Sequence, residues 1–201
     1  MALLRRALSP LGFVLVGLCF LLPFVTVGHA SETERVAATW HGTDLTVGGK
    51  ARLHLEELLW DEHLQRYTMQ DVSAELAPML RAWIGDPLFV PSQPAFIAAA
   101  LLVLLGVLAG VLAGAWSRAV TACAAGLAGA GVLAVGEWLA LLRVDRFITS
   151  DAAHAAATYG FWLAVGLLAL LGAGNAVAAY RLRRRAGAAP PVEANPMTVL
   201  P

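Results

Sequence analysis

The run PAFIAAALLVLLGVLAGVLAGAW, residues 94–116, contains no charged side chain. At about 1.5 Å per residue, a helix of this length crosses the roughly 30 Å hydrocarbon core of a bilayer. Two more runs of spanning length follow, residues 119–142 and 158–180, and Glu137 is the one charged residue within them. The sequence therefore predicts three membrane-spanning helices between residues 94 and 180.

A fourth apolar run, LSPLGFVLVGLCFLLPFVTVG at residues 8–28, predicts a first spanning helix that Pro23 kinks. An alternative remains open. Arg5 and Arg6 followed by an apolar run, with small residues at Gly28 and Ala30, also suit a signal peptide cleaved after Ala30. The run is longer than the usual signal core of about 7–15 residues, which favours a retained helix.

The composition also indicates an integral membrane protein. The chain of 201 residues is 59% hydrophobic and 14% charged, whereas soluble domains are about half apolar and a quarter charged. Its formal net charge of +0 gives no basis for nucleic-acid binding. Both cysteines, Cys19 and Cys123, lie inside apolar runs, so their spacing indicates neither a disulfide framework nor a zinc site.

The basic residues predict the orientation. They lie before the first run, between the second and third runs, and directly after the last run: Arg5, Arg6, Arg118, Arg181, Arg183, Arg184 and Arg185. With four helices these places share one side, which the positive-inside rule makes the cytoplasm. Arg143 and Arg146 oppose this assignment, but the terminal cluster is larger. We expect a multi-pass plasma-membrane protein with both termini in the cytoplasm.

The expected fold is an all-α integral membrane protein. It has four transmembrane helices and a small mixed α/β extracytoplasmic loop region between the first two. The expected parts are a cytoplasmic N-terminus with the first helix (1–28), the loop region (29–93), helices two to four (94–180), and a basic, then disordered, cytoplasmic tail (181–201).

Within the loop region, residues 36–40 predict an extended run. Turn signals at residues 42–44 and 48–49 bracket residues 45–47, and together these features predict a small hairpin. Leucine spacing predicts a helix over residues 53–64, and a second helical stretch, interrupted by Pro78, over residues 72–83. Three prolines make residues 87–94 extended. About 60 residues form a marginal core alone, so we expect the region to pack on the helix ends.

Two features inside the helices are candidates for function. Gly106, Gly110 and Gly114 form a GxxxGxxxG stripe for close helix packing. The short connection at Ser117-Arg118 favours the third helix as its partner, where Gly126 and Ala130 offer a small face. A second copy of the chain is the alternative partner.

Glu137 is the other candidate. A charge within a membrane span costs about 2.5–3.5 kcal/mol on insertion scales, so it needs a partner or a water-lined site. The simpler interpretation is a structural acid that pairs with Arg143, Arg146 or a loop arginine. The alternative is a site for a proton or cation.

Signatures of catalysis are absent from the sequence, with no GxSxG, P-loop, GxGxxG or HExxH motif. The histidines of the loop region have no tight metal-ligand spacing. We therefore expect no catalytic residues, no metal and no cofactor, and a protein that is more plausibly not an enzyme.

Residues 22–27 (LPFVTV) end the first run, and Trp40, Gly42, Asp44, Gly48 and Gly49 follow in the loop region. This pattern resembles small actinobacterial four-helix membrane proteins, in which a Pro-Phe-Val-x-Val helix end precedes an aromatic-x-Gly-x-Asp-Leu and Gly-Gly loop. The Ala-, Gly-, Arg- and Val-rich composition fits such a source. The resemblance implies the topology and this outer-loop motif, and it implies no activity.

The sequence favours a non-enzymatic plasma-membrane protein whose outer loop contacts an envelope partner or ligand. The runner-up is a small transporter, channel or accessory subunit that uses Glu137. The protein's other expected partners are the lipid bilayer and a second copy of the chain. Nucleic acid is not among them.

Overall fold

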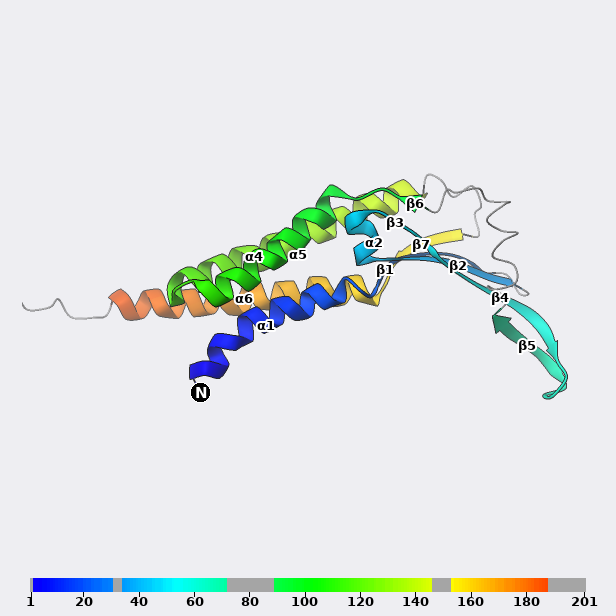
Figure 1. Cartoon of the computed structure of the whole chain (residues 1–201), viewed down its shortest axis with the longest axis horizontal. Coiled ribbons are helices and arrows are strands. Elements are labelled where there is room, and N and C mark those ends of the chain that lie inside the picture. Colours follow the sequence, from blue (N-terminus) through cyan, green and yellow to red (C-terminus); the bar gives the residue numbers. More distant parts are fainter. Residues whose placement is uncertain (1, 31–33, 72–88, 146–152, 188–201) are drawn as a thin grey trace, which may run out of the picture.

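The computed structural model describes residues 2–30, 34–71, 89–145 and 153–187. Its long helices form a bundle and its strands lie at one end of that bundle (Figure 1). These helices are α1 (Ala2–Cys19), α4 (Pro94–Leu112), α5 (Ala115–Asp145) and α6 (Tyr159–Gly187). The first residues of α1 and the last of α6 lie at the other end, away from the sheet (Figure 1).

Three of the helices are long and apolar enough to cross a membrane: Pro94–Leu112, Ala115–Leu142 and Tyr159–Ala186. At most 39% of the positions in each span are buried inside the protein, so their apolar side chains largely face outward. A soluble bundle would carry charged residues there. The helix α1 contributes a shorter apolar segment, Leu8–Cys19.

The prediction that the first helix continues to Gly28 is wrong. The helix α1 ends at Cys19, Phe20 to Leu22 form a turn, and Pro23 begins the strand β1 (Pro23–Ala30). Proline suits the first position of a strand, because the ladder needs no N–H donor from that residue. The β-branched residues Val25, Thr26 and Val27 then favour the extended chain.

An antiparallel five-stranded sheet has the order β5-β4-β2-β1-β7. Besides β1, it contains β2 (Glu34–His41), β4 (Arg52–Asp61), β5 (Arg66–Asp71) and β7 (Ala153–Ala157). The strand β1 pairs with β2 on one side and with β7 on the other, as Thr26 opposite both Thr39 and Ala156 illustrates. The sheet thus joins the segment that follows α1 to the segment that precedes α6.

A short helix, α2 (Gly42–Val47), connects β2 to a second, two-stranded sheet of β3 (Gly49–Lys50) and β6 (Phe89–Val90).

The extended run predicted at residues 36–40 is confirmed as part of β2. The small hairpin predicted from the turn signals at residues 42–44 and 48–49 is wrong, since the helix α2 occupies residues 42–47. The helix predicted at residues 53–64 is also wrong, since β4 and a turn lie there. The helical stretch predicted at residues 72–83 lies outside the described residues.

Phenylalanine side chains connect the sheet to the bundle. The fully buried ring of Phe24 in β1 lies 5.2 Å from that of Phe20, 6.1 Å from Phe96 in α4 and 6.2 Å from Phe161 in α6. One buried cluster therefore extends from the middle of the helices into the sheet, where it includes Trp40. The strands pack on the ends of the helices and share their core.

Candidate functional sites

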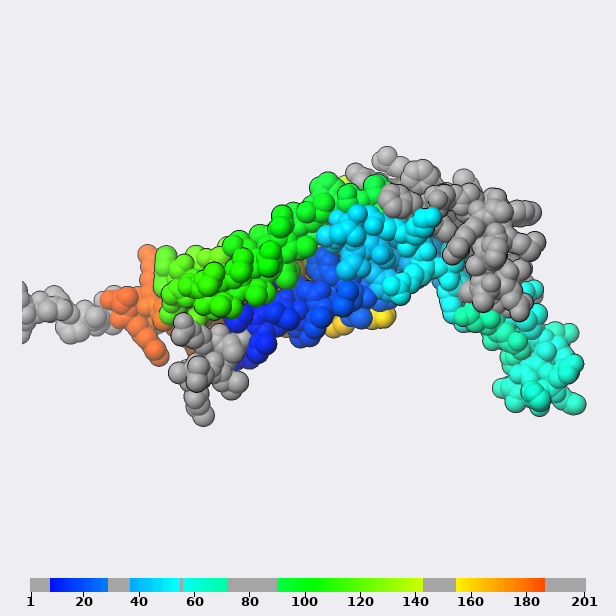
Figure 2. All heavy atoms as spheres, in the orientation of Figure 1, coloured from blue at the N-terminus to red at the C-terminus, as the bar shows by residue number. Residues whose placement is uncertain are grey.

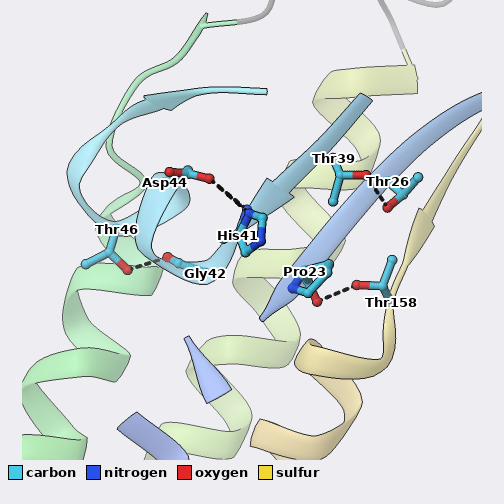
Figure 3. Close-up of polar contacts among 8 residues, drawn as sticks. All are labelled: Pro23, Thr26, Thr39, His41, Gly42, Asp44, Thr46 and Thr158. Atoms are coloured by element: carbon cyan, nitrogen blue, oxygen red, sulfur yellow. Dashed lines mark hydrogen bonds and ion pairs between the residues drawn. The ribbon is translucent and has the colours of Figure 1, made fainter. Parts of the chain in front are cut away.

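The outer-loop motif forms the joint between sheet and helices. Trp40 is 5% exposed and belongs to the shared core. Asp44, in the first turn of α2, accepts a hydrogen bond from the backbone N–H of His41 at 2.9 Å, and the Thr46 hydroxyl donates to the Gly42 carbonyl at 2.7 Å (Figure 3). This arrangement fixes the start of α2, as a helix-capping carboxylate does.

Two backbone contacts attach α2 to the turn after α1. The Gly42 N–H donates to the Leu22 carbonyl and the Thr43 N–H donates to the Phe20 carbonyl at 2.8 Å. A Cβ on Gly42 would lie 2.9 Å from the Phe20 Cα, so only glycine allows this approach. On the far side, the Gln93 N–H donates to the Leu45 carbonyl and ties α2 to the start of α4.

The glycine pair of the motif has a similar role. Gly48 ends α2 with a φ of 85°, a conformation that side chains other than glycine disfavour. A Cβ on Gly49 would lie 2.8 Å from the Asp44 Cβ. All five residues of the motif thus have a structural reason for their identity.

The glycine stripe of α4 packs within the chain, but against a different helix from the one predicted. A Cβ on Gly106 would lie 2.6 Å from the Phe13 ring, and one on Gly110 would lie 2.8 Å from Pro10, so both face α1. Gly114 lies beyond the end of α4 with nothing within 4 Å of such a Cβ. Gly126 does not face the stripe either, because its neighbours are Leu168 and Gly172 of α6. Gly172 in α6 was the sequence signal that could have identified α6 as the helix facing Gly126.

Glu137 lies inside the bundle, where it is 2% exposed. Neither carboxylate oxygen has a hydrogen-bond partner among the described residues. Pairing with Arg143 or Arg146 stays a prediction, because both side chains lie outside the described part of the chain. A buried carboxylate without a partner is costly, so this residue differs from every other acid that the structure describes.

The position of Glu137 along the bundle follows from helix geometry. It is 11 positions after Gly126 on α5, which corresponds to roughly 16 Å and almost the same helical face. Since Gly126 contacts Leu168 and Gly172, Glu137 faces α6 near its first turn. The adjacent Gly136 lies against Ala95 and Phe96 at the start of α4. The carboxylate therefore lies where the helices meet the sheet.

A third feature was not anticipated from the sequence: the hairpin of β4 and β5 carries exposed aromatic side chains. Trp60 is 52% exposed and Tyr67 is 65% exposed, and their rings meet edge to face at 5.1 Å. The turn between them adds Leu64, which is 56% exposed. Asp61 holds this turn by accepting hydrogen bonds from the N–H groups of His63 and Leu64. The hairpin projects beyond the rest of the described chain (Figure 2).

Exposed aromatic residues also occur at two levels of the bundle. Trp116 lies in the first turn of α5 and Tyr180 lies near the end of α6. These two helix ends lie away from the sheet (Figure 1). At the sheet end lie Trp138 of α5 with Tyr159 and Trp162 of α6. Trp116 and Trp138 are 22 positions apart, or about 33 Å along a helix. That distance matches the hydrocarbon thickness of a bilayer, and aromatic side chains concentrate at its two faces.

No protein-family model and no curated protein matches the chain. Among the described residues no group of three metal-ligating side chains occurs.

Proposed function

We propose that the protein spans the plasma membrane with four helices, keeps both termini in the cytoplasm and holds its sheet outside. The aromatic residues at two levels support this placement, because they bound an apolar belt of bilayer thickness. The arginines in the last turns of α6 lie at the end away from the sheet, which suits the cytoplasmic face.

The contacts of the first helix favour its retention. Cleavage after Ala30 would remove α1 and β1 together. It would uncover the faces of Gly106 and Gly110, take the fully buried Phe24 out of the core, and leave β7 without its partner strand. A mature chain without these residues would need another structure, so we propose that α1 is the fourth span.

Within this topology we propose a non-enzymatic role, in which the β4–β5 hairpin contacts a protein of the cell envelope. The observation that carries this proposal is the exposed cluster of Trp60, Leu64 and Tyr67 at the tip. Large aromatic side chains are the residue types that anchor protein interfaces. The motif around Trp40, by contrast, is buried in the joint, so recognition is better assigned to the hairpin.

Site-specific photo-crosslinking in living cells tests this role. A photoreactive amino acid at position 64 or 67 is expected to give one discrete adduct with an envelope protein. The control is position 47, because Val47 is 77% exposed but belongs to α2 at the joint. No adduct at positions 64 and 67, in protein that reaches the membrane, would contradict the role. An adduct of twice the chain mass would identify a second copy as the partner.

A transport role is the second candidate, and the buried carboxylate of Glu137 favours it. Acids inside membrane spans mark pathways for protons and cations in many membrane proteins. In this case Glu137→Gln should abolish a proton or cation flux in proteoliposomes and leave thermal stability near that of the wild type. An unchanged flux, or no flux in the wild type, would remove this candidate.

The resemblance to small actinobacterial membrane proteins rests on residues that build the joint. We therefore propose that it reflects a shared fold, in which α2 locks a sheet to the helices, and not a shared ligand.

A further inference from the structure

A cavity of about 520 Å³ opens at the end of the bundle that lies away from the sheet. Its lining combines guanidinium groups with apolar side chains, and includes Arg118, Arg181, Arg185, Leu8 and Leu182. Among the described residues, no carboxylate lines it. Such a lining attracts an anion that also carries apolar groups.

The three arginines come from two helices. Arg118 is in the first turn of α5, whereas Arg181 and Arg185 are one turn apart on α6 and share a face. Ala115, at the first position of α5, also lines the cavity. The positive end of the α5 helix dipole therefore adds to the charge of the guanidinium groups.

The polar wall of the cavity is ordered by contacts within the bundle. The side-chain N–H of Asn175 in α6 donates to the Leu171 carbonyl at 2.8 Å and to the Ser9 hydroxyl at 3.3 Å. Both Ser9 and Asn175 line the cavity. This contact ties α1 to α6 beside the arginines, so the cavity is formed by packed helices and not by one flexible side chain.

The cavity lies at the level along the helices that a lipid headgroup would occupy. Arg118 follows the exposed Trp116 by two positions, and Arg181 follows the exposed Tyr180 directly. Aromatic side chains at helix ends occupy the headgroup level.

We infer that this cavity binds the phosphodiester headgroup of an anionic phospholipid from the cytoplasmic leaflet. The inference rests on the proposed membrane placement and does not depend on the role of the hairpin. Arginine forks bind phosphate oxygens in pairs, and a basic pocket between helices on the cytoplasmic side is a typical site for such lipids.

Thermal unfolding of the full-length protein in a neutral detergent tests the site. Phosphatidylglycerol should raise the melting temperature of the wild type by several degrees, whereas phosphatidylcholine should not. The double variant Arg118→Gln/Arg181→Gln should bind phosphatidylglycerol at least roughly tenfold more weakly. The matched control is Arg183→Gln/Arg184→Gln, which loses the same charge outside the cavity and should respond as the wild type does.

A second variant covers the case in which the loss of two arginines impairs folding. Ala178 lines the cavity, and Ala178→Trp should fill it while every arginine is kept, so the selective shift should disappear. Equal responses of the two double variants, or equal stabilisation by both lipids, would overturn the inference. A shift of the same size with millimolar inorganic phosphate alone would overturn the lipid source and assign the cavity to a soluble phosphate. That outcome would leave the hairpin proposal intact.

Discussion

Gly106 of α4 and Phe13 of α1 are in direct contact, and a Cβ on the glycine would lie 2.6 Å from the phenylalanine ring. Phe13 is fully buried. The first helix thus packs closely on α4, because α4 carries glycine at two successive turns, Gly106 and Gly110.

Substitution of the stripe should destabilise the protein in proportion to these contacts. We expect Gly106→Leu and Gly110→Leu each to lower stability by about 1–3 kcal/mol, the usual effect of overpacking a filled interface. Gly114→Leu is the matched control, since its position is open. Melting temperatures in detergent measure the difference. Equal losses for all three would show that glycine flexibility, and not packing, matters.

The interior position of Glu137 leads to a clear expectation for stability. A buried carboxylate with no partner among the described residues costs free energy, and an apolar side chain of similar size removes that cost. Glu137→Leu should therefore be at least as stable as the wild type, with a gain of up to about 1–3 kcal/mol. A loss of several degrees in melting temperature would mean that the carboxylate is bound by groups outside the described residues.

The joint should be sensitive to small changes in its motif. Asp44→Ala removes the acceptor for the His41 N–H and should cost about 1 kcal/mol. Gly42→Ala should cost more, because its Cβ meets the Phe20 backbone. Limited proteolysis and thermal unfolding measure both effects. Glu62→Ala, in the exposed turn of the hairpin, is the acidic control and should be neutral within about 0.5 kcal/mol.

The proposed topology is open to a direct measurement. Reporter domains inserted in the turn at residues 62–65 and fused after Gly187 should report opposite sides of the membrane, with the second in the cytoplasm. Intact mass of the purified protein should include residues 1–30. Reporters on the same side would refute four spans, and a mature chain that begins near Ser31 would reduce the count to three.

The sequence predicted the helices α4, α5 and α6 well, because hydropathy over a bilayer length is a strong signal. It failed at β1 for the same reason. Residues 20–28 continue the apolar run of α1, so hydropathy alone extends the helix. The local signal was Pro23 followed by Val25, Thr26 and Val27, which together favour a strand. Burial against Phe96 and Phe161 explains why this strand is apolar.

The prediction failed at β4 for a different reason. Leucines and glutamates at residues 53–59 have high helix propensity, but pairing with β2 and β5 imposes the extended chain. Strand β7 has the weakest local signal, since Ala153–Ala157 is mostly alanine and its pairing with β1 determines its structure. The exposed Trp60 and Tyr67 could be recognised as a surface only once β4 and β5 were known to be a hairpin.

The position of β1 between β2 and β7 also has a consequence for biosynthesis. The Thr158 hydroxyl donates to the Pro23 carbonyl, although the two residues are 135 positions apart. While the chain is being synthesised, β1 can pair with β2 early, but its other edge stays open until the residues before α6 leave the ribosome. Completion of the sheet therefore coincides with synthesis of the last helix. A chain truncated before β7 would present that unpaired edge to quality-control proteases.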